Sequence, residues 1–152
     1  MKTKRSFALS AALCAALTLS TTANANPVMI EAESIRTLDM MLMATSLRCR
    51  KGEHDFRAEY AMFSRHNGHL LRNANETMRR NLHTTYGLRG GERALDRMSV
   101  RMANNYGNGH PWMSCSELKA AAIDLARAHS RASLAAAANR LLSPPQIAYD
   151  FP

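Results

Sequence analysis

The sequence predicts an all-α protein, a four-helix up-down-up-down bundle closed by one disulfide. Apolar residues recur at three- and four-residue steps over almost all of the chain after Ile30, and no stretch alternates convincingly as a strand. The connections between these periodic stretches are short, which favours antiparallel neighbours. Two cysteines, Cys49 and Cys115, fall where such a bundle would bring them to the same end.

The first helix is expected to begin near Glu31 and to end near Arg48. Acidic residues begin this stretch and basic residues end it, an arrangement that the helix dipole favours. Gly52 is a suitable stop. The apolar face of this helix consists of Ile35, Leu38, Leu42, Thr45 and Cys49.

A second periodic stretch begins at Phe56 and ends near Tyr86-Gly87. Unbroken, it would run about 50 Å at 1.5 Å per residue, which is longer than its neighbours. We therefore expect the second helix to be bent or broken near Gly68. Its apolar face consists of Phe56, Tyr60, Phe63, Leu70, Ala74, Met78 and Leu82.

The third helix is expected to follow Gly90-Gly91 and to be closed by Gly107. Four arginines recur every four residues along it, and their guanidinium groups suit phosphate or carboxylate partners. These residues, called the arginine stripe below, are Arg89, Arg93, Arg97 and Arg101. Glu92 and Asp96 lie within reach of the first two and would partly neutralise them. A solvated helix face is the simpler interpretation of such a pattern, and an anionic partner is the functional one.

The fourth helix is expected to start at a capping box formed by Ser114 and Glu117. An alanine-rich stretch continues it to Leu142, where a Ser-Pro-Pro sequence stops it. The helical domain therefore covers 26–143, and 144–152 is a C-terminal tail.

The N-terminus has the pattern of an export signal. Three basic residues within the first five positions precede an apolar run over 7–19 and a small-residue site, Ala23-Asn24-Ala25. The run is shorter than the ~20 residues that cross a bilayer, and no later stretch approaches that length. We expect 1–25 to be a signal peptide cleaved near Ala25, and the mature protein to be periplasmic or secreted, without a transmembrane segment.

Export would change the net charge of the mature protein and restrict its possible partners. Three of the 20 basic residues and none of the 12 acidic ones lie in the expected signal peptide, so the net charge of +8 falls to +5 without it. The remaining length suits one domain. We expect no nucleic acid partner for an exported protein, which leaves an anionic envelope component or a protein as the partner of an arginine-rich surface.

Signal-peptide cleavage would remove Cys14 and leave Cys49 and Cys115, which in an exported chain favours one disulfide. Closing a loop of about 66 residues would contribute roughly 4 kcal/mol in the chain-entropy model. Several polar and aromatic side chains would gather at the same end of the bundle as this bond. They are Arg48, Arg50, Lys51, His54, Asp55, His110 and Trp112.

His54-Asp55-Phe56 with Tyr60, shortly after Cys49, resembles the His-Asp helix of secreted calcium-dependent phospholipases. That resemblance implies that His54 is the base that activates water and that Asp55 is a calcium ligand. The glycine-rich calcium loop of that family should lie upstream, where this sequence has the helical pattern LDMMLMATSLRCRKG. In the alternative interpretation Asp55 stabilises a helix N-terminus and His54 faces water.

Histidine and methionine pairs suggest a second alternative, a periplasmic metal-binding protein. His66 and His69 are one turn apart, as are Met40 and Met43, and thioether sulfur suits Cu(I). No ligand set is complete, and methionine commonly fills gaps in cores. We therefore assign no metal ligands and expect no cofactor.

The segments SLRCRKG (46–52), RALDRMSVRMANNYGNGHPWMSC (93–115) and ELK (117–119) resemble a group of small exported bacterial helical proteins whose role is not established. The resemblance implies a fold and a compartment but no reaction. Some members of that group carry an adenosylhomocysteine-hydrolase label. We do not expect that activity, because the chain is too short for a dinucleotide-binding domain plus a substrate domain and shows no strand-rich halves.

The sequence thus favours a non-catalytic binding or interaction module of the cell envelope. Its contact surface would be either the arginine stripe or the end that carries His110 and Trp112, because a partly exposed tryptophan in a loop can anchor a partner. The ring of Trp112 could instead pack over the disulfide. The catalytic alternative is a small secreted hydrolase that uses His54 with Asp55, or His110.

Overall fold

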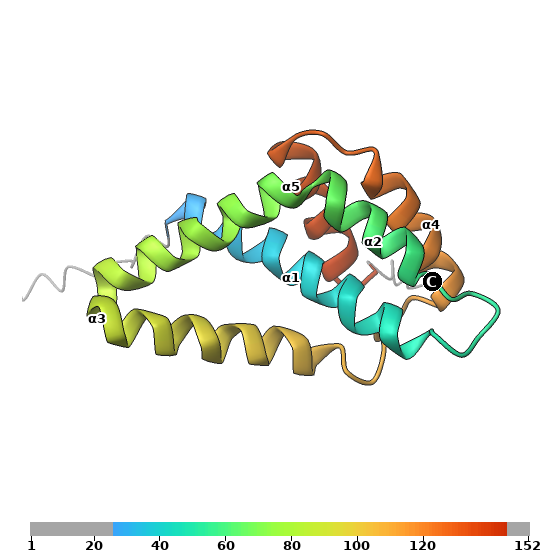
Figure 1. Cartoon of the computed structure of the whole chain (residues 1–152), viewed down its shortest axis with the longest axis horizontal. Coiled ribbons are helices and arrows are strands. Elements are labelled where there is room, and N and C mark those ends of the chain that lie inside the picture. The colour runs from blue at the N-terminus through green and yellow to red at the C-terminus, as the bar shows by residue number, and fades with distance from the viewer. Residues whose placement is uncertain (1–25, 146–152) are drawn as a thin grey trace, which may run out of the picture.

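The computed structural model describes residues 26–145, and this part of the chain is all-helical, with no strand. Five helices follow one another. They are α1 (Pro27–Arg48), α2 (Arg57–His66), α3 (Gly68–Asn105), α4 (Cys115–Ala126) and α5 (Arg131–Leu142) (Figure 1). The all-α prediction is confirmed. The expected signal peptide, 1–25, and the tail beyond Pro145 lie outside the described residues.

Helix α1 is the centre of the molecule and contacts each of the other four helices. Asn26 caps its N-terminus by accepting a hydrogen bond from the Val28 amide at 3.0 Å. Figure 1 shows α1 running between two antiparallel lengths of α3. Its predicted apolar residues Ile35, Leu38 and Leu42 are completely buried, because other helices pack against α1 from several sides.

The expected break near Gly68 is confirmed, and Asn67 forms the joint between α2 and α3. The Asn67 side chain is completely buried. Its Nδ2 donates hydrogen bonds to the carbonyl of Phe63 at 3.2 Å and to that of Leu125 at 3.0 Å. The joint is therefore fixed to the end of α4 rather than left as a free hinge.

Helix α3 folds back on itself at Gly87, whose φ of 69° and ψ of 172° are non-helical. We call 68–86 the first arm and 88–105 the second arm; Figure 1 shows them antiparallel, close together at the hairpin and with α1 between them farther from it. The second arm begins directly after Gly87, so Gly90 and Gly91 lie inside a helix instead of separating two helices as expected. Gly91 is buried against His83 of the first arm, and a Cβ at this position would overlap that ring. The close approach of the two arms therefore requires glycine.

The expected fourth helix is two helices, so the four-helix up-down-up-down order is not confirmed. The capping box is present at the start of α4, but the helix ends at Ala126. There His66 Nδ1 lies 3.0 Å from the Ala126 carbonyl, next to the bond from Asn67 to Leu125. Side chains from the joint thus satisfy carbonyls that a continuing helix would have used. Ser130 then caps α5 by accepting a hydrogen bond from the Ser133 amide at 3.1 Å.

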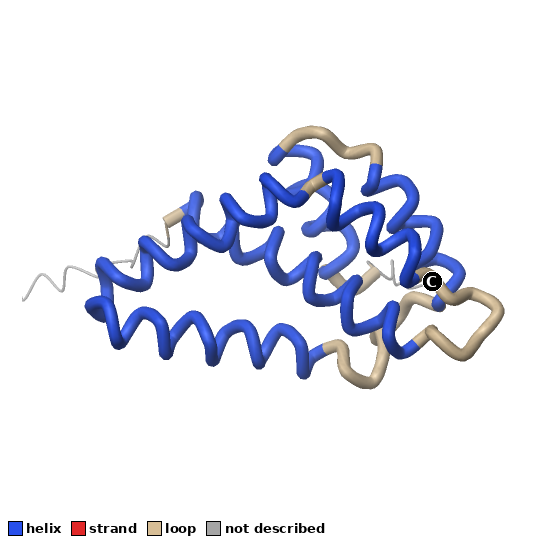
Figure 2. The backbone as a smooth tube through the Cα atoms, viewed as in Figure 1, coloured by secondary structure: helices blue, strands red, loops and turns tan. Residues whose placement is uncertain are grey.

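Cys49 and Cys115 lie at disulfide distance, with their Cα atoms 5.9 Å apart, so the predicted pairing is confirmed. Cys49 directly follows α1 and Cys115 is the first residue of α4. The loops that join α1 to α2 and α3 to α4 lie at the same end of the molecule (Figure 2). A Cβ built on Gly109 would lie 3.9 Å from Cγ of Arg48, so the loop before α4 passes close to the end of α1. Within 26–145, no helix combines the length and the apolar character that crossing a membrane would require.

Candidate functional site

The arginine stripe lies on the second arm of α3, and all four of its side chains are exposed. The opposite face of this arm is buried through Ala94, Leu95 and Met102. At 100° per residue, positions four apart drift by about 40°, so the stripe turns by about 120° around the helix from Arg89 to Arg101 while its four side chains stay exposed. The structure therefore places these four residues together on one solvent-facing surface.

Glu92 does not neutralise the arginine stripe as its spacing suggests. Its carboxylate lies 3.1 Å from Arg79 Nε and 2.7 Å from His83 Nε2, both on the first arm. The hairpin at Gly87 brings these partners opposite Glu92, which sequence spacing alone does not reveal. Among residues 26–145, neither Asp96 nor any residue of the stripe forms an ion pair within 4.0 Å. The positive charge of the stripe is therefore available to a partner.

Apolar side chains accompany this charge. Tyr86 and Leu88 flank Gly87 and are 60% and 73% exposed. We call 86–88 the tip of the hairpin. Val100, 51% exposed, lies farther along the second arm. A shallow depression of about 550 Å³ begins at Leu88 and is lined by His83, Leu88, Arg89, Glu92 and Arg93.

Both ring nitrogens of His110, a predicted site residue, form hydrogen bonds with backbone groups. Nδ1 accepts a hydrogen bond from the Met113 amide at 3.2 Å, so Nε2 carries the proton and donates to the Leu141 carbonyl at 3.1 Å. Burial lowers the pKa of the imidazole, against the raising effects of the bond to Leu141 and of the Glu117 charge. This ring joins the loop before α4 to the end of α5.

Trp112 packs edge-on against His110, with ring centroids 4.8 Å apart. On its other side His110 stacks on Tyr106 at 5.7 Å. Trp112 remains 38% exposed, so it is part of the surface at this end of the molecule. The architectural contacts thus involve mainly His110, and Trp112 keeps an accessible face.

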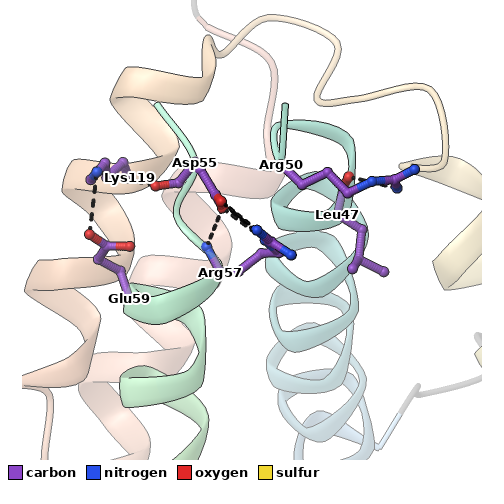
Figure 3. Close-up of polar contacts among 6 residues, drawn as sticks. All are labelled: Leu47, Arg50, Asp55, Arg57, Glu59 and Lys119. Atoms are coloured by element: carbon purple, nitrogen blue, oxygen red, sulfur yellow. Dashed lines mark hydrogen bonds and ion pairs between the residues drawn. The ribbon is translucent and has the colours of Figure 1, made fainter. Parts of the chain in front are cut away.

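The Asp55 carboxylate binds the side chain and the amide of Arg57, and so stabilises the start of α2 (Figure 3). Its Oδ1 accepts a hydrogen bond from the Arg57 amide at 3.1 Å, and its Oδ2 lies 2.7 Å from Arg57 Nη2. Hydrogen bonds from the Arg57 side chain and amide lower the pKa of Asp55 to about 2. Lys119 of α4 donates to the Asp55 carbonyl at 3.1 Å and pairs with Glu59 at 3.4 Å (Figure 3).

The structure does not assemble the phospholipase-like arrangement in the described part of the chain. His54 is exposed, and no hydrogen bond or ion pair in 26–145 engages its side chain. No hydrogen bond, ion pair or aromatic contact joins it to His110 in that part. A general base needs an orienting partner and a reacting group within hydrogen-bond reach, so the His54–Asp55 alternative has no geometric support.

The metal-binding alternative likewise lacks an assembled site among the described residues. His66 contacts the Ala126 carbonyl, whereas His69 is exposed. Met40 packs against the core. Nowhere in 26–145 do three His, Cys, Asp or Glu side chains gather closely enough to hold a metal ion.

The buried carboxylate of Asp39 on α1 was not predicted from the sequence. Asp39 is only 8% exposed, and its two oxygens accept hydrogen bonds from Arg36 at 2.5 Å and from Tyr60 at 3.2 Å. Burial raises the pKa of Asp39, although the positive charge of Arg36 acts in the opposite direction. Burial and the negative charge of Asp39 together raise the pKa of Tyr60 to about 12. The cluster borders a groove of about 460 Å³ between α1 and the first arm of α3. The position of Asp39 among the apolar residues of the first helix was the feature of the sequence that could have predicted its burial.

No family model, curated protein or solved structure matches this chain. The resemblance to small exported bacterial proteins therefore stays an expectation from the sequence.

Proposed function

We propose that this protein is a non-catalytic binding module that recognises an anionic partner through the arginine stripe. The observation that carries the proposal is the diversion of Glu92 to Arg79 and His83. This pairing leaves four guanidinium groups exposed on one helix, and no carboxylate of residues 26–145 forms an ion pair with them. Guanidinium groups in such a row suit phosphate, sulfate or carboxylate groups that repeat along a surface or a polymer.

Export to the cell envelope is part of the same proposal. The N-terminal pattern of basic residues, apolar run and small-residue site supports it. The cysteine pair at disulfide distance supports it as well, because such bonds persist in oxidising compartments. The partner would then be an anionic component of the envelope.

The engagement of two candidate catalytic groups, His110 and Asp55, supports a binding role over a catalytic one. Both ring nitrogens of His110 are used by backbone groups, and the Asp55 carboxylate is used by Arg57. Neither is free to take a proton from a substrate without first losing a structural contact.

Binding to a soluble polyanion tests the proposal. The affinity of the full chain for dextran sulfate would be measured by titration calorimetry at several salt concentrations. Replacing all four stripe arginines by glutamine should weaken binding at least about thirtyfold, at roughly 0.5 kcal/mol for each exposed charge contact. The dependence of affinity on salt should become shallower in the same variant.

A matched variant separates the stripe from net charge. It replaces four other exposed arginines by glutamine and so removes the same charge; they are Arg65, Arg72, Arg127 and Arg140. We expect this variant to bind dextran sulfate almost as tightly as the unaltered protein. Equal losses in the two variants would mean that general positive charge, and not the stripe, is responsible.

A further inference from the structure

We propose that the anionic partner is a lipid surface, and that the protein docks on it through the second arm of α3 with the tip of the hairpin entering the headgroup region. This inference rests on the proposed function, because it names the partner of the arginine stripe. It adds a second contact, the apolar tip, for which a soluble polyanion has no counterpart.

The backbone at Gly87 creates the tip. The chain reverses there, and the side chains on either side of the reversal cannot reach the core that the two arms bury. Leu88, at 73%, is the most exposed large apolar side chain in the described part of the protein. Tyr86, at 60%, adds an amphipathic ring of the kind enriched where membranes meet water. Exposed apolar groups beside basic ones indicate an interaction site more strongly than either does alone.

The second arm continues from the tip as a basic surface that turns slowly around the helix. Arg89 and Arg101 are twelve residues apart, about 18 Å at 1.5 Å per residue. Arginine side chains are long enough to reach one flat surface despite the slow drift of the stripe around the helix. Val100, half-exposed, lies on the same outer face. The outer face thus offers guanidinium groups to lipid phosphates over the length of the arm.

The burial of its inner face limits how deeply the second arm can insert into a lipid surface. Ala94, Leu95 and Met102 are buried against the rest of the protein, so this arm has no apolar face left to insert. The acidic groups of the arm do not prevent docking. Glu92 is held by Arg79 and His83 at 3.1 and 2.7 Å, and Asp96 is outnumbered by its arginine neighbours. We therefore infer peripheral attachment by charge, with Leu88 and Tyr86 as the groups that enter the interface.

Vesicle binding is the direct test. The full chain would be sedimented with vesicles of phosphatidylglycerol mixed into phosphatidylcholine, and with vesicles of phosphatidylcholine alone. We expect binding to the anionic vesicles only, weakened about fivefold for each stripe arginine replaced by glutamine. Leu88→Ser should weaken vesicle binding about tenfold through the lost apolar contact and leave dextran sulfate binding unchanged. Ile123→Ser, at an exposed position on α4, is the matched control and should alter neither.

A fluorescent reporter locates the tip. Trp112 is the only tryptophan of the chain, so Leu88→Trp combined with Trp112→Phe places a single indole at the tip. Brominated lipids should quench that indole in anionic vesicles. Ile123→Trp in the same Trp112→Phe background should not be quenched.

The outcomes separate the two proposals. If dextran sulfate binding depends on the stripe but Leu88→Ser leaves vesicle binding unchanged, or the tip indole is not quenched, the lipid inference is overturned and the proposed function stands. The lipid inference is equally overturned if anionic vesicles do not bind the unaltered protein. If the stripe variant binds dextran sulfate and vesicles as the unaltered protein does, both proposals fail.

Discussion

At the scale of single residues, His110 shows how a side chain suggestive of chemistry can serve architecture. One ring nitrogen accepts from the Met113 amide and the other donates to the Leu141 carbonyl, so the neutral ring satisfies two backbone groups at once. A protonated ring would carry a hydrogen on both nitrogens and would lose the bond from Met113. The fold therefore favours neutral His110.

This preference predicts a pH dependence of stability. Burial lowers the pKa of folded His110 below the ordinary value of about 6.5. As pH falls through 6.5, the unfolded chain takes up a proton at this position before the folded chain does. The contribution of neutral His110 is thus fully present above pH 6.5 and is lost as pH falls from 6.5 towards the folded pKa.

His110→Phe keeps a ring beside Tyr106 but removes the hydrogen bonds of the imidazole with the Met113 and Trp112 amides and the Leu141 carbonyl, which should cost about 1–3 kcal/mol near pH 7.5. Urea unfolding at a series of pH values should show the difference from the unaltered protein shrinking below pH 6.5. His129→Phe, at an exposed position, is the control. A difference that stays constant over this range would contradict the assignment of a neutral, doubly bonded ring.

At the scale of helices, two reversals decide the shape of the protein, and each has a local cause. The hairpin in α3 depends on Gly87, whose φ of 69° and ψ of 172° lie in a region that is essentially restricted to glycine. The turn between α4 and α5 depends instead on tertiary contacts, because His66 and Asn67 bond to the last carbonyls of α4. Backbone conformation explains the first reversal and packing explains the second.

Gly87→Ala tests the first of these causes. Space is not the obstacle, since within the described part of the chain no atom beyond the local backbone and the neighbouring residues lies within 4 Å of a Cβ built at this position. The cost is conformational, and we expect a loss of about 1–3 kcal/mol in the free energy of unfolding. Gly107→Ala is a matched control, because the backbone there has no positive φ and the nearest atom lies 3.6 Å from the added Cβ. Denaturant titration of both variants would measure the contrast, and equal stabilities would disprove the strain.

At the scale of the whole molecule, the disulfide connects the central helix to the C-terminal half. Cys49 lies at the end of α1 and Cys115 at the start of α4, 66 residues apart in sequence. The bond therefore restricts the unfolded chain over a loop that contains α2 and all of α3. In the folded protein it joins the end of α1 to the start of α4, at the end of the molecule where the two loops lie (Figure 2).

Reduction should lower the free energy of unfolding by roughly 4 kcal/mol, the chain-entropy value for a loop of this length. Guanidinium chloride unfolding with and without a reducing agent would measure the loss. The double variant Cys49→Ala with Cys115→Ala serves as the control and should unfold identically under both conditions. Full stability under reduction would mean that the bond contributes nothing to the folded state.

The sequence by itself determined the helical class, several helix ends and the break near Gly68. These features follow from local causes, namely apolar periodicity, capping residues and glycine, which act between residues close in the chain. The cysteine pairing was predictable for a different reason, because only two cysteines remain after the expected signal peptide. The same periodicity also placed the arginine stripe on one face of a helix.

Only the tertiary structure decided which charges are free. Spacing assigned Glu92 to the stripe, but the reversal at Gly87 carries it to Arg79 and His83. The tertiary structure also divided α4 from α5 and buried Asp39 beside Tyr60, which lies 21 residues away in sequence. Each of these results depends on groups that meet only after the helices pack. Local propensities carry no information about which distant partner will satisfy a given carbonyl or carboxylate.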